Sequence, residues 1–263
     1  MSKIYQDILY QNRAGVARIT INRAEKLNAF TNHTADELID AMTVASWDRS
    51  VAVIVIAGAG DKAFCTGGDQ SAKSEQTKTG RGTTGMPTGE LYSLFRDAPK
   101  PVIARVQGYA IGGGNVLATV CDLTIASDRA IFGQVGPKVG SVDPGWGTAY
   151  LSRIVGEKRA REMWYLCRRY DAYQALRMGL CNRVVAHDEL DHEVDRWAQA
   201  IVSHSPTALA IAKRSFNVAS ESIRATGDLG REALALYYQT AESKEGMRAF
   251  LEKRPARFRS LSG

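Results

Sequence analysis

The sequence predicts an α/β fold in which strand and helix units repeat, with helices packed on β-sheets and a helical region at the C-terminal end. Three observations predict it. The segment 51–57 is continuously apolar between polar neighbours, which is typical of a strand covered on both faces. Glycine clusters at 67–68 and 112–114 directly follow strand-like segments. From Gly145 onward, helical periodicity replaces the strand pattern.

In the first half of the chain, the expected elements follow from local patterns. Residues 4–9 and 16–21 favour two strands of a hairpin, joined by the polar turn 11–15. Thr34-Ala-Asp-Glu37 has the form of a capping box, which predicts that a helix begins there. The polar segment 71–87 has no periodicity, and such a long insert is usually functional or mobile. The other expected elements are strands at 51–57, 101–106 and 123–126 and short helices at 91–95 and 115–120.

The second half of the chain is expected to be mainly helical. The predicted helices cover residues 148–155, 157–168, 172–178, 190–204, 207–219 and 229–253. We place a soft division at residue 200, with the core in 1–200 and an oligomerisation region in 201–263. The last helices carry large apolar residues that need a surface to pack on, such as another subunit; these are Leu234, Leu236, Tyr237, Tyr238 and Phe250.

The composition is that of an ordinary soluble globular protein, with 44% hydrophobic and 24% charged residues. The net charge of +6 is mild and comes without long Lys/Arg runs, which argues against nucleic acid and suits a small anionic ligand. The four cysteines show no metal-type spacing. With no signal peptide and no long apolar span, we expect a cytoplasmic protein with reduced thiols, no membrane partner and no metal.

The run Gly112-Gly113-Gly114-Asn115 lies where a strand passes into a helix. Glycines there permit a positive φ and the close approach of a ligand. The unpaired amides of the helix start, with the positive end of the helix dipole, favour an anion or an oxyanion. A tight turn or a packing contact explains the pattern equally well. The spacing is neither that of a P-loop nor that of a dinucleotide fingerprint.

Three separated segments, 62–70, 108–126 and 132–147, together resemble the enoyl-CoA hydratase/isomerase (crotonase) superfamily over nearly the whole chain. The resemblance implies a crotonase-like spiral of ββα repeats with a C-terminal helical trimerisation region, assembled as a trimer or a dimer of trimers. It also implies an acyl-CoA thioester substrate bound in the core, and no cofactor, because coenzyme A is part of the substrate. By motif position, the backbone amides of Gly68 and Gly113 would form the oxyanion hole for a thioester enolate.

The resemblance also identifies candidate catalytic side chains. Enoyl-CoA hydratases use two glutamates, and the matching positions here hold Val116 and Gly136, which argues against hydration of a C=C bond. Ser141, Asp143 and Tyr238 match residues that face the reacting carbons in naphthoyl-CoA synthases. A carboxylate can take a proton and a phenol can give one. The alternatives are a loop cap for Asp143 and a packed helix aromatic for Tyr238.

An anion-binding position of the synthases matches Gln134 and the amide of Gly136. Val135 replaces the threonine between them, so a bicarbonate or chloride there would lack one hydroxyl partner. The sequence is compatible with either an occupied or an empty position.

The coenzyme A contacts follow from the resemblance by position. They are Lys26 and Leu27 for the nucleotide end, Ala63, Phe64 and Cys65 for the adenine side, and Phe250 and Lys253 from a neighbouring subunit. For each lysine, an ordinary surface position is an equally good interpretation.

Within the superfamily, the segments 80–83, 133–138 and 141–145 most resemble 2-ketocyclohexanecarboxyl-CoA hydrolase, a relative of 1,4-dihydroxy-2-naphthoyl-CoA synthase. The synthases carry a lysine, an arginine and a tyrosine on the loop that follows residue 70. Here the two basic positions hold Ser71 and Lys73, and the stretch from Ser71 to Leu91 contains no tyrosine, the next one being Tyr92. The sequence therefore favours hydrolytic ring opening, as in anaerobic-type degradation of benzoate and related aromatic or alicyclic acids.

The mechanistic hypothesis is a retro-Claisen cleavage that converts 2-ketocyclohexanecarboxyl-CoA and water to pimeloyl-CoA. Asp143, aided by Ser141, activates the water, the oxyanion hole holds the enolate, and Tyr238 or a water that it positions protonates the α-carbon. Three alternatives remain. They are the naphthoyl-CoA synthase of menaquinone biosynthesis, a non-catalytic acyl-CoA-binding subunit, and a thioesterase that would release free coenzyme A.

Overall fold

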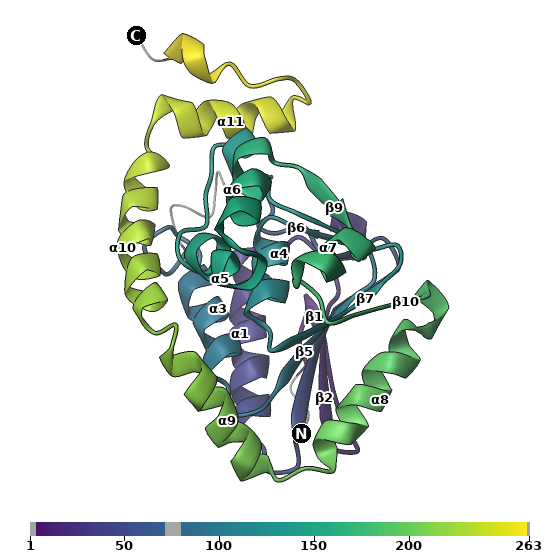
Figure 1. The fold of residues 1–263 in the computed structure, drawn as a ribbon. Coiled ribbons are helices and arrows are strands. Elements are labelled where there is room, and N and C mark those ends of the chain that lie inside the picture. The colour runs from purple at the N-terminus through teal and green to yellow at the C-terminus, as the bar shows by residue number, and fades with distance from the viewer. Residues whose placement is uncertain (1–3, 72–79, 262–263) are drawn as a thin grey trace.

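The computed structural model describes residues 4–71 and 80–261 (Figure 1). In this part of the chain the larger of two sheets has six strands in the order β1-β2-β3-β5-β7-β10. All neighbours are parallel except β1 and β2, which form an antiparallel hairpin. The strands are β1 (Ile8–Arg13), β2 (Val16–Ile21), β3 (Val53–Gly58), β5 (Val102–Val106), β7 (Leu123–Ser127) and β10 (Arg183–Val185).

The smaller sheet has four strands, β4 (Ala63–Cys65), β6 (Tyr109–Ile111), β8 (Ile131–Gly133) and β9 (Arg169–Asp171). Successive repeats give one strand to each sheet and then a helix. Thus β3 and β4 precede α3 (Thr88–Asp97), and β5 and β6 precede α4 (Gly113–Val120). This arrangement confirms the predicted spiral of ββα repeats.

Both faces of the larger sheet are covered by helices (Figure 1). On one face, α8 (Leu190–Val202) packs Leu190, Val194 and Ala198 against β3, β5 and β7. On the other face, α1 (Asn32–Trp47) and α3 enclose the main core. Every residue of β3 is buried, as the apolar run predicted.

Two boundaries near the N-terminus differ from the prediction. The first strand begins at Ile8 rather than Ile4, and it turns at Ala14 and Gly15, which both have positive φ (50° and 81°). Such a two-residue turn matches the twist of an antiparallel hairpin. The first long helix is capped by Thr31, whose side chain accepts a hydrogen bond from the backbone N–H of Thr34. The capping box therefore begins three residues earlier than predicted.

The C-terminal half is helical, as predicted, but its last stretch is not one helix. The helices are α5 (Leu151–Val155), α6 (Glu157–Leu166), α7 (Ala172–Met178), α9 (Pro206–Val218), α10 (Ser222–Tyr237) and α11 (Ala241–Leu251). The predicted helix over 229–253 is wrong, because the chain breaks after Tyr238 and Thr240 caps α11 by accepting from the Ser243 N–H. After the break, α11 lies at the upper end of the molecule in Figure 1, beside α6.

The two last helices touch the loop that follows β8. On α11, the Ser243 hydroxyl donates to the Gly140 carbonyl at 2.7 Å. On α10, Gly230 lies directly against the Pro144 ring, and Gly227 lies against Gly145. A Cβ at Gly230 would lie 2.2 Å from the Pro144 Cβ, and a Cβ at Gly145 would lie 2.6 Å from the Gly227 Cα, so α10 can approach the loop this closely only with glycines at positions 230 and 145.

Helix α9 is held on the core by Lys213, which is buried and donates to the Phe95 carbonyl, the Lys100 carbonyl and the Asp122 carboxylate. Within the described residues, every helix falls short of the length and hydropathy that a membrane span requires. The division at residue 200 and the trimer remain predictions.

The close contact of α10 with the loop predicts a difference between two alanine variants. In Gly230→Ala, the new methyl group would overlap the Pro144 ring, so we expect the free energy of unfolding to fall by about 1–3 kcal/mol. In the control Gly227→Ala, one turn earlier, the nearest atom is the Arg231 Nη1 at 3.2 Å, which can move aside. Chemical denaturation measures both; equal stability of the two variants would contradict this packing.

Candidate active site

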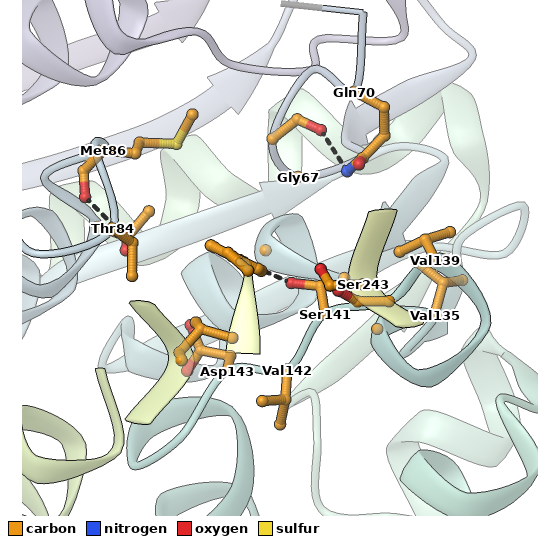
Figure 2. Close-up of a pocket in the computed structure, with 18 of the residues that line it drawn as sticks. Gly67, Gln70, Thr84, Met86, Val135, Val139, Ser141, Val142, Asp143 and Ser243 are labelled. Carbon is orange, nitrogen blue, oxygen red and sulfur yellow. Dashed lines mark hydrogen bonds between the residues drawn. The ribbon is translucent and has the colours of Figure 1, made fainter. Parts of the chain in front are cut away.

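A cavity of about 430 Å³ lies between the two glycine clusters, the loop after β8 and the end of α10 (Figure 2). Gly68 and Gly113 line one side of it, and Ser141, Asp143 and Tyr238 line another. The structure therefore brings all five predicted catalytic residues to one cavity. Their chemical roles stay predictions.

The two glycine clusters are in direct contact. Gly67 has a φ of 83°, and a Cβ built on it would lie 2.7 Å from the Gly113 nitrogen. Gly112 also has a positive φ (58°), and the peptide after it starts α4. Among the described residues, neither the Gly68 nor the Gly113 N–H donates a hydrogen bond. Both amides are thus available to an oxygen in the cavity.

The loop that carries Gly68 is fixed by Asp69. The Asp69 carboxylate accepts from the Ser71 N–H at 3.0 Å and from the Ser71 hydroxyl at 2.6 Å, and it pairs with Arg23 at 3.3 Å. Burial alone would raise the pKa of Asp69, but these partners hold it below its usual range. Phe30 adds two backbone hydrogen bonds, from its N–H to the Gly67 carbonyl and from the Asp69 N–H to its carbonyl.

Asp143 faces the cavity from the loop after β8 (Figure 2). Its Oδ1 accepts from the Gly147 N–H at 2.8 Å. Burial raises the pKa of Asp143 to about 6, although the Gly147 hydrogen bond and the charge of Arg231 act in the opposite direction. A carboxyl with such a pKa exchanges protons near neutral pH, as a general base must.

The Ser141 and Tyr238 hydroxyls lie 2.7 Å apart (dashed in Figure 2). Tyr238 is the residue that directly follows α10 in the same chain. The break between α10 and α11 therefore places its side chain at the site. Burial raises the pKa of Tyr238, which keeps the phenol protonated. The pair can therefore supply a proton.

The two positions that match the glutamates of enoyl-CoA hydratases hold no acidic residue here. Val116 is fully buried in α4 beside Asp143, and both side chains approach Gly147. At Gly136, a Cβ would lie 2.5 Å from the Ser141 carbonyl oxygen and 2.8 Å from the Trp164 ring, so this position cannot hold a glutamate in the observed backbone. Among the described residues that line the cavity, Asp143 is the only carboxylate.

Two polar groups at this cavity, Tyr92 and Arg231, were not predicted from the sequence, and a third, Gln134, was predicted only as an anion-binding position. Tyr92 of α3 is buried and its hydroxyl donates to the Gly113 carbonyl at 3.3 Å. Burial and then the charge of Asp143 raise the pKa of Tyr92. Gln134 places its Nε2 in a buried position where it has no hydrogen-bond partner among the described residues. Arg231 of α10 also lines the cavity, and its spacing from Tyr238 by seven residues was a usable signal.

The predicted coenzyme A contacts are spread over several elements. Lys26 and Leu27 form an exposed turn, and the Thr66 hydroxyl at the cavity donates to the Leu27 carbonyl at 3.2 Å, which links this turn to the site. Ala63, Phe64 and Cys65 are buried in β4. Phe250 and Lys253, at the end of α11 and just after it, do not line the cavity of their own chain. Phe250 and Lys253 are expected to contact coenzyme A in a neighbouring subunit. All seven coenzyme A contacts stay predictions.

Part of the predicted functional loop, including Lys73, lies outside the described residues. In the ranges that are described, no group of three His, Cys, Asp or Glu side chains is placed to hold a metal ion.

Comparison with known proteins shows likeness over nearly the whole chain. A family model for enoyl-CoA hydratase/isomerase matches residues 11–261. An enoyl-CoA hydratase from Mycobacterium avium subsp. paratuberculosis K-10 is similar with a TM-score of 0.86 and 29% identity, over 97% of this chain and 99% of that one. An enoyl-CoA hydratase/isomerase from Xanthobacter autotrophicus Py2 is similar with a TM-score of 0.84 and 31% identity, over 98% of this chain and 97% of that one. An enoyl-CoA hydratase from Bacillus anthracis is similar with a TM-score of 0.75 and 30% identity, over 96% of this chain and 99% of that one.

The raised pKa predicts that Asp143 destabilises the fold at neutral pH. The pKa of an ordinary aspartate carboxyl is 3.8, and burial raises the pKa of Asp143 to about 6 in the folded protein. The folded state therefore binds this proton more tightly, and stability is lost as the pH rises from about 4 to about 7. Asp143→Asn stays neutral at every pH. Its free energy of unfolding should exceed that of the native protein by about 1–2 kcal/mol above pH 7, a value that is reduced because solvent in the cavity screens the charge, and the two should be equal near pH 4.

Urea denaturation at the two pH values measures this difference. Asp188→Asn, on the exposed surface, is the matched control and should show none. Equal stability of Asp143→Asn and the native protein at both pH values would contradict a destabilising buried carboxylate.

Proposed function

Since the chain belongs to the enoyl-CoA hydratase/isomerase family and is an acyl-CoA-processing enzyme, we propose that it opens the ring of a cyclic β-keto acyl-CoA by hydrolysis. The proposed substrate is 2-ketocyclohexanecarboxyl-CoA and the product is pimeloyl-CoA. The similar solved structures are named enoyl-CoA hydratases, so the proposal departs from those names.

The observation that carries the proposal is the placement of the acid. Asp143 is the only carboxylate among the described cavity residues, and the two hydratase-type positions hold Val116 and a Gly136 that has no room for a side chain. A single carboxylate opposite a pair of free amides suits a reaction that needs one base and one stabilised enolate.

The proposed reaction uses these groups in sequence. Asp143, with Ser141 orienting the water, takes a proton while the water oxygen adds to the ring ketone carbon. The bond from that carbon to the α-carbon then breaks, and its electron pair forms a thioester enolate at the Gly68 and Gly113 amides. Losing one such donor typically costs about 3 kcal/mol of barrier. Tyr238, or a water that it positions, protonates the α-carbon, and a carboxylic acid is left on the former ketone carbon.

A second candidate is 1,4-dihydroxy-2-naphthoyl-CoA synthase. Ser141, Asp143 and Tyr238 meet at the cavity and would serve that ring closure too. The synthase also needs two basic residues and a tyrosine on the loop after residue 70, where this chain has Ser71 and Lys73 and no tyrosine. That difference favours the hydrolase.

We also propose a cytoplasmic homotrimer or dimer of trimers that would bring Phe250 and Lys253 to a neighbour's site. Its support is the exposed apolar surface of the last helices, including Leu229, Leu236 and Phe250, which are 75%, 74% and 54% exposed in the single chain.

Product masses separate the candidate activities. With 2-ketocyclohexanecarboxyl-CoA, we expect a product that has gained one water and kept its thioester. The synthase would instead remove one water from o-succinylbenzoyl-CoA, and a hydratase would add water to crotonyl-CoA. Release of free thiol would indicate a thioesterase, and tight binding of every substrate without a product would indicate a non-catalytic subunit; either result would overturn the proposal.

The pH dependence tests Asp143 as the base. Because Asp143 must be ionised, kcat/KM should fall about tenfold per pH unit below about pH 6. Asp143→Asn should bind substrate normally and turn over about 10²- to 10⁴-fold more slowly, without this acidic limb. Steady-state kinetics from pH 5 to 8 measure both, and near-native turnover by the variant would remove Asp143 from the mechanism.

A further inference from the structure

Arg231 occupies a space that two glycines leave open. Its guanidinium lies over Gly89 of α3, where a Cβ would be 2.5 Å from the Arg231 Nε and 2.6 Å from its Cζ. On the other side, a Cβ at Gly227 would be 3.2 Å from its Nη1. The side chain is only 14% exposed. The guanidinium is therefore held between two helices at the cavity wall rather than extended into solvent.

The charge of Arg231 is only partly satisfied. One nitrogen, Nη2, pairs with Asp228, whose side chain is 65% exposed. Among the described residues, the one hydrogen bond that this guanidinium donates is from Nη2 to Asp228, although a guanidinium has five N–H donors. Arg231 lines the catalytic cavity and also a second cavity of about 320 Å³.

The other described cation at the catalytic cavity serves a different purpose. Lys244 lies on the exposed rim and donates to the Gln239 carbonyl at 2.9 Å. Arg231 is thus the half-buried cation of this cavity in the described part of the chain, and it has donors to spare close enough to Asp143 for its charge to act on that carboxyl.

The proposed reaction creates a second negative charge that the glycine amides do not meet. Gly68 and Gly113 bind the thioester oxygen. The ketone oxygen, beside Asp143, becomes an alkoxide when water adds and then part of a carboxylate when the ring opens. A guanidinium is suited to a carboxylate, because it offers parallel donors to both oxygens.

We propose that Arg231 is a specificity-determining residue that binds the carboxylate formed at the distal end of the acyl chain, and the alkoxide that precedes it. The ligand class is an acyl-CoA with an anionic group at the end of the acyl arm. This inference rests on the proposed function for the identity of that group, but not for the presence of the cation.

Two acyl-CoA probes of equal chain length test it by binding alone. Pimeloyl-CoA and heptanoyl-CoA both have a seven-carbon acyl chain, and only the first has a terminal carboxylate. We expect the native enzyme to bind pimeloyl-CoA at least tenfold more tightly in isothermal titration. In Arg231→Gln, the preference should fall to about twofold or less, with heptanoyl-CoA binding unchanged. Arg231→Lys, which keeps the charge but loses the paired donors, should be intermediate.

Arg224→Gln is the matched control. Arg224 lies two turns earlier on α10, pairs with Asp97 and Glu221, and does not line the catalytic cavity. It should keep the full preference for pimeloyl-CoA, which separates a local contact from a change of net charge.

Each outcome decides the inference. It is overturned if the native enzyme does not prefer pimeloyl-CoA, or if Arg231→Gln keeps the preference, even when the ring is opened normally. If the preference depends on Arg231 and the ring is not opened, the carboxylate site stands and the proposed function fails. Weak binding of both probes by Arg231→Gln, with Arg231→Lys showing no partial preference, would indicate a structural role and also overturn it.

Discussion

The site depends on the contact between two glycine clusters. Gly67 lies so close to the Gly113 nitrogen that a single methyl group at residue 67 would separate them. The contact joins the loop after β4 to the start of α4, and it places Gly68 and Gly113 at one cavity. Asp69 pairs with Arg23 and accepts two hydrogen bonds from Ser71, and these contacts fix the loop after β4.

The opposite wall is built by long-range packing. Gly230 of α10 and Gly145 of the loop let that helix lie on the loop that carries Asp143, and α11 fixes the same loop through Ser243. The chain break after Tyr238 then sets its hydroxyl beside that of Ser141. Holding the Asp143 carboxylate in this poorly hydrated place lowers the stability of the fold, but it gives the group a pKa of about 6, which suits proton transfer.

Local patterns predicted much of this molecule. The buried strand β3, the ββα order and the placement of Gly68 and Gly113 at one cavity followed from apolar runs and from short sequence motifs. The break between α10 and α11 did not, because Tyr238 to Thr240 contains neither glycine nor proline and the turn is fixed by packing on Gly140. Tyr92 and Arg231 were missed for a related reason: each lies on an inward helix face whose neighbours come from distant parts of the chain.

The central claim is that water attacks the ring ketone while the thioester survives. The most direct measurement is the position of oxygen-18 after turnover of 2-ketocyclohexanecarboxyl-CoA in labelled water, read by fragmentation mass spectrometry. We expect one labelled oxygen in the distal carboxylate of an intact acyl-CoA. Label in a free acid released together with coenzyme A, or an unlabelled substrate, would contradict it.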